Sequence, residues 1–189
     1  MVDAELGPML LTIARSAIAA RLDLPRSGEP RDPALLQPAA TFVTLKRFGE
    51  LRGCIGSLEP VRSLRDDVSA NAVAAAFRDP RFAPLEAHEF ASTSVEVSLL
   101  SANERLAVAD EAELAARLRP GVDGAILEFE GRRATFLPQV WEAIPDPREF
   151  LVALKRKAGW SDRFWSPRMN VFRYSVTKWA EREILMNAD

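Results

Sequence analysis

The chain has 189 residues, of which 48% are hydrophobic and 28% charged, and its formal net charge is −2. A chain of this length can bury a core that needs no disulfide or metal staple. Its one cysteine, Cys54, excludes an internal disulfide and any zinc or iron–sulfur site built from several cysteines, and its mixed charges do not resemble the basic face that binds nucleic acid.

The first predicted elements are a helix, a proline-rich connection and a β-hairpin. Apolar residues recur at steps of three and four from Leu6 to Leu22, which is typical of an amphipathic helix. The stretch LPRSGEPRDPALLQP that follows contains four prolines and indicates a surface connection. The β-branched run from Ala40 to Arg47 predicts a strand, FGEL a turn, and RGCIGSL a second strand.

A second helix and the clearest strand of the chain come next. Ser63 followed by Asp66 resembles a capping box, which predicts a helix that runs to about Arg78. Its middle, NAVAAAF, favours helix and allows close approach of a neighbour, and DPRFAPL ends it. STSVEVSLL then alternates apolar and polar residues, which predicts a half-buried strand.

The last third is predicted to form a short helix, a hairpin, a helix and a strand. Asp110 with Glu113 caps the short helix, and GAILEFEGRRATFL forms the hairpin around Glu130-Gly131. Pro147 and Gly159 mark the start and end of the next helix, and MNVFRYSV is the last strand.

This order of elements predicts an α+β fold with a largely antiparallel sheet flanked by helices. We expect a single domain over residues 1–189, with a boundary between a larger and a smaller lobe near residues 101–109. No apolar run approaches the roughly 20 residues that span a bilayer, so no membrane partner is expected. The N-terminus lacks a leading basic cluster and reads poorly as a signal peptide, which makes the cytoplasm the expected location.

The segment LRGCIG is the most unusual part of the chain. Gly53 and Gly56 weaken a strand, so it is expected to contain a bulge or to bring its backbone close to something. Arg52 lies two residues before Cys54, and in an extended strand both side chains point to the same face. Arg52 would then favour the thiolate and make Cys54 a nucleophile. The alternative, which spacing alone favours, is that Cys54 is a small buried apolar residue beside a bulge.

Four spaced blocks carry a family resemblance: LRGCIGSLEP, NAVAAAFRDPRF, ATFLPQVW and LKRKAG. Together they resemble the AMMECR-type domain family, and more narrowly its branch called AmmeMemoRadiSam system protein A, from about Thr41 to Val176. The resemblance implies an α+β fold with a larger and a smaller lobe and a cleft beside the LRGCIG strand. It implies no established reaction and no known cofactor, and the branch name implies Memo-like and radical SAM proteins as partners in a shared pathway.

The resemblance also implies a set of site residues. Cys54 and Arg52 are the catalytic candidates, and no metal ligand is among them. The ligand-binding candidates come from the signature strand and the second block, with weaker matches in LKRKAG: Gly53, Gly56, Asn71, Arg78, Asp79, Arg81 and Phe82, then Lys155 and Lys157.

The residues of the second block also allow an interpretation that does not depend on the family resemblance. Asp79-Pro80 forces a turn, after which Arg78 and Arg81 could hold a carboxylate or phosphate by paired hydrogen bonds. The alternative is a surface arginine pair that stacks on Phe82 or bridges to Asp79. The amide of Asn71 could bind a ligand or satisfy loop backbone groups, and the second role is favoured because most side-chain hydrogen bonds go to backbone or water.

Other candidates are weaker. His88 is the one histidine, but relatives are not expected to keep it, so a Cys54–His88 pair is disfavoured. Glu59 could serve as a base or be a solvated turn residue. The four tryptophans, which all lie in the last third, are expected mainly in the core.

Two functions from different classes follow. The first is an enzyme or a small-molecule-binding protein that uses a cleft beside the LRGCIG strand for a small or anionic ligand. The second is a non-catalytic accessory or protein-binding module in which LRGCIG is structural.

Overall fold

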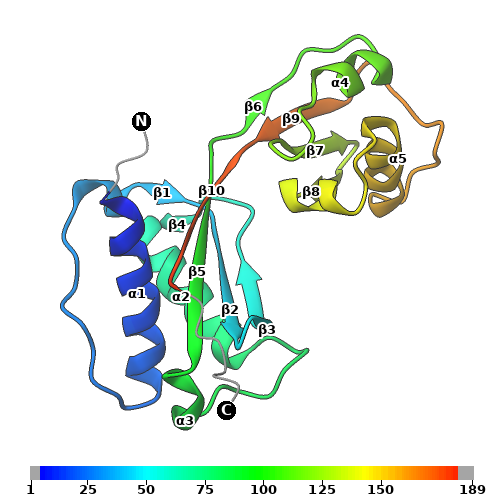
Figure 1. Cartoon of the computed structure of the whole chain (residues 1–189). Coiled ribbons are helices and arrows are strands. Elements are labelled where there is room, and N and C mark those ends of the chain that lie inside the picture. The colour runs from blue at the N-terminus through cyan, green and yellow to red at the C-terminus, as the bar shows by residue number, and fades with distance from the viewer. Residues whose placement is uncertain (1–4, 183–189) are drawn as a thin grey trace. The chain divides into compact units, whose positions relative to one another are not determined.

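The computed structural model describes residues 5–182. Within them the chain forms two compact units (Figure 1): one contains the described residues up to Leu100 and those from Thr177, and the other is Ser101–Val176. Each unit has a four-stranded sheet and a hydrophobic core of its own. The paired strands of both sheets are antiparallel and helices pack on them, which confirms the predicted α+β class.

The elements of the first unit come mostly from the N-terminal half. They are α1 (Leu6–Arg21), the 3₁₀ helix η1 (Pro33–Leu36), β1 (Pro38–Ala39), β2 (Thr41–Arg47), β3 (Glu50–Gly56), β4 (Arg62–Ser63), α2 (Leu64–Phe77), α3 (Ala87–Phe90), β5 (Thr93–Leu100) and β10 (Val176–Ala180).

The sheet of the first unit has two different faces. Its strand order is β10-β5-β2-β3, so β3 is an edge strand, while β1 and β4 pair with each other in a separate two-stranded sheet. Val43 and Leu45 of β2 and Val97 of β5 are fully buried in a core with residues of α1 and α2. We call this side the inner face. Because side chains alternate along a strand, the residues between them point to the opposite, outer face.

Local capping fixes the ends of α2, as the sequence predicts. The Ser63 hydroxyl accepts a hydrogen bond from the Asp66 amide at 3.2 Å and donates one to the Asp66 carboxylate at 2.6 Å. The helix ends at Phe77, two residues before Asp79-Pro80, because a residue before proline disfavours helical geometry.

The second unit contains the remaining elements. They are β6 (Glu104–Arg105), α4 (Glu111–Arg117), β7 (Gly124–Phe129), β8 (Arg132–Phe136), the 3₁₀ helix η2 (Pro138–Glu142), α5 (Pro147–Lys157) and β9 (Asn170–Tyr174). The predicted turn at Glu130-Gly131 is confirmed, with both residues at positive φ. Asp146 caps α5 and Gly159 follows its end at positive φ, also as predicted. Trp141 stacks on Phe150 with ring centroids 3.7 Å apart in the centre of the core.

The last predicted strand differs from the structure. The run MNVFRYSV was expected to be one strand, but the chain leaves β9 at Tyr174 and begins β10 at Val176. β9 pairs within the sheet of the second unit, whereas β10 lies in the sheet of the first. Trp179 of β10 therefore packs on the first core, where it lies against Gly7.

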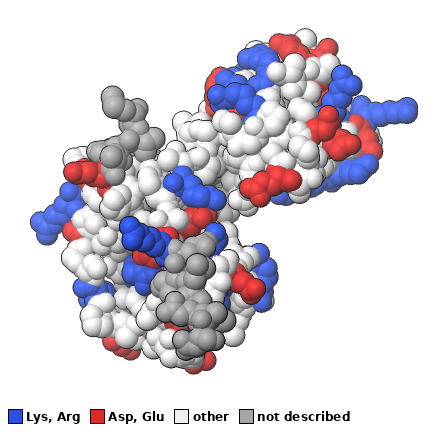
Figure 2. Space-filling model, viewed as in Figure 1, with Lys and Arg blue, Asp and Glu red and all other residues white. Residues whose placement is uncertain are grey.

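Charged side chains of both signs are spread over the surface. On the face drawn in Figure 2, lysines and arginines lie interspersed with aspartates and glutamates. Several of them form ion pairs, among them Arg173–Glu104 and Arg156–Asp162. Between residues 5 and 182, none of the helices combines the length and the apolar character needed to cross a membrane.

Candidate functional site

Gly53 is required where β3 packs directly on α2. Gly53 pairs with Leu45, so its missing side chain belongs to the inner face. A Cβ at this position would overlap the backbone carbonyl oxygen of Ala75. The alanine-rich stretch of α2 lets the strand come this close, and Ala72, Ala75 and Ala76 are all buried. The expected close approach of the strand backbone is therefore present, with the helix as its partner.

Close packing also explains the glycine at position 56, here on the outer face. It pairs with Phe42, and a Cβ there would overlap the Phe42 ring. The ring therefore lies over the strand end at Gly56, where a side chain would displace it.

Arg52 does not share a face with Cys54, and the sequence prediction is wrong here. Leu45 pairs with Gly53 but Lys46 pairs with Leu51, so Arg52 is an extra residue in a β-bulge. Its guanidinium donates to the Glu89 carboxylate at 2.8 and 3.1 Å and to the carbonyl of Ala83 at 3.0 Å. The bulge redirects the side chain to the segment after α2.

The partner of Arg52 is a buried carboxylate that the sequence did not indicate. Glu89 is 8% exposed and also accepts from Arg47 at 3.0 Å and from the Glu86 amide at 3.0 Å. The hydrogen bond from Arg52, aided by the Glu86 amide and the charge of Arg47, lowers the pKa of Glu89 to about 2. The capping box that Glu89 forms with Glu86 is local, but nothing nearby in the sequence indicates Arg47 and Arg52, which lie more than 30 positions away.

Cys54 lies on the outer face opposite Thr44. It is half-buried, and its Sγ is 3.1 Å from the Thr44 hydroxyl, within hydrogen-bonding distance for sulfur. Thr44 also pairs with Glu96 of β5, which forms ion pairs with Lys178 at 3.0 Å and Lys46 at 3.8 Å. The thiol is thus at the edge of a polar row that crosses four strands. Thr44 was missed in the sequence, although the hairpin register could have shown it.

Asp79 and Arg81 bind the backbone of Cys54. The Asp79 carboxylate accepts from the Cys54 amide at 2.8 Å, and the Arg81 guanidinium donates to the Cys54 carbonyl at 3.2 Å. Arg81 also donates to Asp79 at 2.7 and 2.9 Å. These bonds, with that from Arg81 first, hold the pKa of Asp79 well below its usual range.

The same contacts raise the pKa of Arg81, chiefly by the hydrogen bond to Asp79 and in part by attraction to Cys54. Arg81 is therefore the basic residue bound to the backbone of Cys54, whereas Arg52 was expected beside the thiol. The Phe82 ring lies 5.5 Å from the Arg81 guanidinium carbon and 6.0 Å from that of Arg52, within the range of cation–π contacts.

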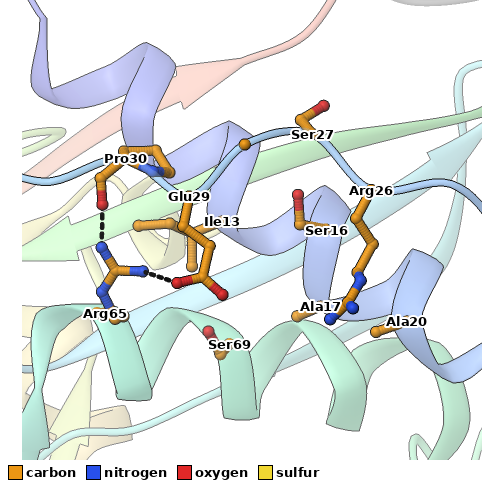
Figure 3. Close-up of a pocket in the computed structure, with 11 residues that line it drawn as sticks. Ile13, Ser16, Ala17, Ala20, Arg26, Ser27, Glu29, Pro30, Arg65 and Ser69 are labelled. Carbon is orange, nitrogen blue, oxygen red and sulfur yellow. Dashed lines mark hydrogen bonds and ion pairs between the residues drawn. The ribbon is translucent and has the colours of Figure 1, made fainter.

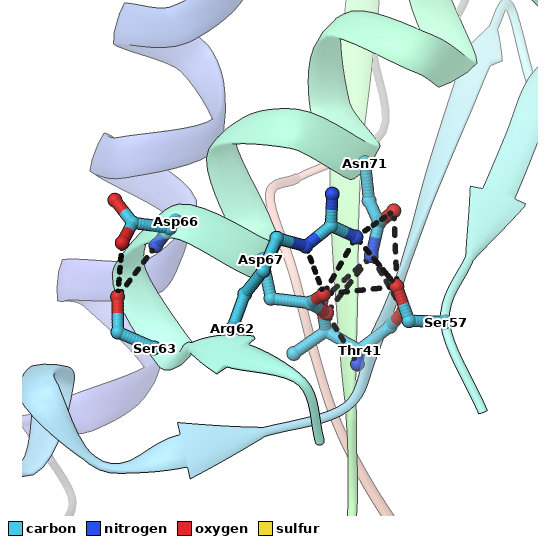
Figure 4. Close-up of polar contacts among 7 residues, drawn as sticks. All are labelled: Thr41, Ser57, Arg62, Ser63, Asp66, Asp67 and Asn71. Atoms are coloured by element: carbon cyan, nitrogen blue, oxygen red, sulfur yellow. Dashed lines mark hydrogen bonds and ion pairs between the residues drawn. The ribbon is translucent and has the colours of Figure 1, made fainter. Parts of the chain in front are cut away.

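Asn71 belongs to a separate buried polar network at the start of α2 (Figure 4). Its amide donates to the Thr41 carbonyl at 2.9 Å and to the Asp67 carboxylate at 2.9 Å. Asp67, which is fully buried, also accepts from Thr41, Ser57 and Arg62. The network joins β2, the segment after β3 and α2. The favoured role of Asn71, binding backbone groups, matches these contacts in part.

The remaining candidates make none of the hydrogen bonds described above for Cys54. Arg78 is exposed, and in the described part of the chain its guanidinium has no hydrogen-bond or ion-pair partner. Lys155 and Lys157 lie in the second unit, where they bind Glu111 and the Thr135 carbonyl respectively. His88 is exposed and pairs with Glu86 at 3.2 Å. Among residues 5–182, no group of three His, Cys, Asp or Glu side chains is arranged to hold a metal ion.

Comparison with known proteins gives a consistent family. The AMMECR1 family profile matches residues 11–179. A protein of Methanothermobacter thermautotrophicus is 39% identical over 90% of this chain and 91% of its own length, and one of Thermofilum pendens is 35% identical over 95% and 92%. The crystal structure of the uncharacterized protein PH0010 from Pyrococcus horikoshii matches with a TM-score of 0.80 and 31% identity, over 96% of this chain and 94% of that one.

Proposed function

The chain belongs to the AMMECR1 family, and we propose on that premise that it binds or transforms a small molecule through the Cys54 thiol on the outer face of β3. The proposed setting is a cytoplasmic pathway shared with a Memo-like protein and a radical SAM protein, as the narrower AmmeMemoRadiSam resemblance implies. The observation that carries the proposal is the contrast between Cys54 and its neighbours. Gly53, Arg52, Asp79 and Arg81 are engaged in contacts that hold the fold, whereas Cys54 is half-buried and its sulfur has one hydroxyl partner among the described residues.

The surroundings of the sulfur favour nucleophilic chemistry. The Thr44 hydroxyl can donate to a thiolate, and Arg81 binds the Cys54 carbonyl with its charge partly offset by Asp79. Hydrogen bonds and nearby cations stabilise a thiolate, which is the reactive form of cysteine. Arg81 is committed to Asp79, so Arg78, whose guanidinium has no partner among the described residues, is the better candidate in this segment for holding an anionic group of the ligand.

The first test is the alkylation of Cys54 by iodoacetamide at pH 7, followed by mass spectrometry. We expect the sulfur to react faster in the folded protein than in the same chain unfolded in urea. Thr44→Val is expected to slow the folded reaction several-fold and to leave the unfolded one unchanged. A folded sulfur that reacts more slowly than the unfolded one would contradict a nucleophilic role.

One observation favours the second function, a non-catalytic accessory module. The glycines of LRGCIG are explained by packing on Ala75 and Phe42, and the edge of β3 is held by Asp79 and Arg81. In that case Cys54→Ser would bind a purified Memo-like partner as tightly as the parent protein. Gly53 variants cannot separate the two functions, because a side chain there disturbs the fold itself.

A further inference from the structure

A second site candidate lies in the first unit, on the helices and therefore away from the outer face. A pocket of about 440 Å³ is enclosed by α1, α2 and the segment 26–30 (Figure 3). This volume is within the range of roughly 300–1,000 Å³ that is usual for small-molecule sites. Small residues of α1, namely Ser16, Ala17 and Ala20, leave the space open.

Arg26 supplies an uncompensated positive charge. Its guanidinium makes no hydrogen bond or ion pair with any residue that the structure describes. Figure 3 shows the side chain directed along α1 toward Ala17 and Ala20. An arginine that lines a pocket without a partner is a ready binding group for a carboxylate.

The other arginine of the pocket is already engaged. Arg65 of α2 donates to the Pro30 carbonyl and lies 3.7 Å from the Glu29 carboxylate. These contacts hold the segment 26–30 over the helices, and Glu29 offsets the charge of Arg65. The pocket is left with one net positive charge, which comes from Arg26.

A buried hydroxyl adds a second polar group. In the described chain, the Ser16 Oγ is closed to solvent and has no hydrogen-bond partner. Figure 3 shows it directed from α1 toward the segment that carries Ser27. A buried hydroxyl without a partner is unfavourable, so a ligand oxygen that reaches it through a small outward shift of this segment would gain a hydrogen bond.

We infer that this pocket binds a small monocarboxylate with a short apolar chain. The carboxylate would bind Arg26 and Ser16, and the chain would lie along Ala17 and Ala20, beside the largely buried Ile13. Inorganic phosphate, which carries more negative charge, is disfavoured by the Glu29 carboxylate. A neutral alcohol of the same length can accept a hydrogen bond from Arg26 but lacks the negative charge that would strengthen it.

The test is NMR titration of the full chain with hexanoate, inorganic phosphate and hexanol. Hexanoate is expected to shift the amide signals of α1 around Ser16 and of the segment 26–30, and to bind more tightly than the other two. Arg26→Gln should weaken hexanoate binding by roughly tenfold or more, because a charged hydrogen bond is lost. Arg31→Gln, which changes a neighbouring exposed arginine that does not line this pocket, should leave it unchanged.

A second variant fills the pocket and so tests whether hexanoate binds inside it. Ala20 is exposed, so Ala20→Phe places a ring in the pocket without disturbing the core and should abolish binding at an unchanged unfolding temperature. The inference is overturned if hexanoate does not bind, if Arg26→Gln binds it as well as the parent does, or if phosphate or hexanol binds equally tightly. Cys54→Ser is expected to leave hexanoate binding intact, so this result is independent of the thiol site.

Discussion

The two faces of β3 differ in how fully their groups are engaged. On the inner face Gly53 lies against the backbone of Ala75, and one and two helical turns away Asn71 and Asp67 form a closed network of hydrogen bonds. On the outer face Cys54 is half-exposed and has one hydroxyl neighbour, Thr44. The comparison teaches that one short segment can be constrained on one side by packing and still present a reactive group on the other. Substitutions on the two sides should therefore have unequal effects.

The largest effect is expected at Gly53. Gly53→Ala should lower the free energy of unfolding by about 3 kcal/mol, because the new methyl group meets backbone that cannot move aside alone. Gly28→Ala is the matched control, since nothing lies within 4 Å of a Cβ there and its change should be small. Urea denaturation of both variants gives the measurement. A Gly53→Ala variant with a nearly unchanged free energy of unfolding would contradict the close packing of Gly53 on Ala75.

The next effect concerns the buried carboxylate that holds Arg52. Because the pKa of Glu89 is lower in the folded than in the unfolded chain, its contribution is complete above the ordinary pKa of 4.5 and is lost as the pH falls toward about 2. Glu89→Gln should cost about 2 kcal/mol at pH 7 and much less at pH 2, since the glutamine keeps an oxygen for the Glu86 amide but leaves Arg52 and Arg47 without a charge partner.

Denaturation at several pH values measures this. Glu50→Gln changes an exposed carboxylate on the strand that carries Arg52; it is the control and should show the parent's dependence on pH. Equal pH dependence of Glu89→Gln and the parent protein would show that the ion pair contributes nothing to stability.

The smallest effects on stability are expected at two adjacent residues, Ile55 on the inner face and Cys54 on the outer face. Ile55 packs against the inner core, and Ile55→Ala should cost about 1.5 kcal/mol. Cys54→Ala should cost less than about 0.5 kcal/mol, because a half-exposed thiol leaves little cavity. Thermal unfolding of both variants compares them directly. Equal losses would mean that the outer face is as tightly packed as the inner one.

The parts of the fold that depend on residues close together in the sequence could be predicted. The cap at Ser63 with Asp66 and the turn at Glu130-Gly131 are both present, because each depends on neighbours in sequence. The break at Ser175 between β9 and β10 could not be predicted in this way. It depends on which sheet each half joins, and the run contains neither glycine nor proline to mark it.

The candidate site was harder for the same reason. The glycines indicated a bulge or a close approach, and β3 has both, but neither Ala75 nor the position of the bulge is marked in the sequence. The expected direction of Arg52 assumed a regular strand, and one extra residue was enough to turn it toward Glu89. Arg81, which the sequence treated as an anion clamp, instead lies at the backbone of Cys54.

The contacts of Asp79 and Arg81 have a consequence for how copies of the chain behave together. An open strand edge is a template on which another chain can add, and β3 is such an edge. The amide of Cys54 already donates to the Asp79 carboxylate, and its carbonyl already accepts from the Arg81 guanidinium. An incoming strand would have to displace both side chains. Loss of this pair is then expected to cause self-association of folded molecules in addition to a loss of stability.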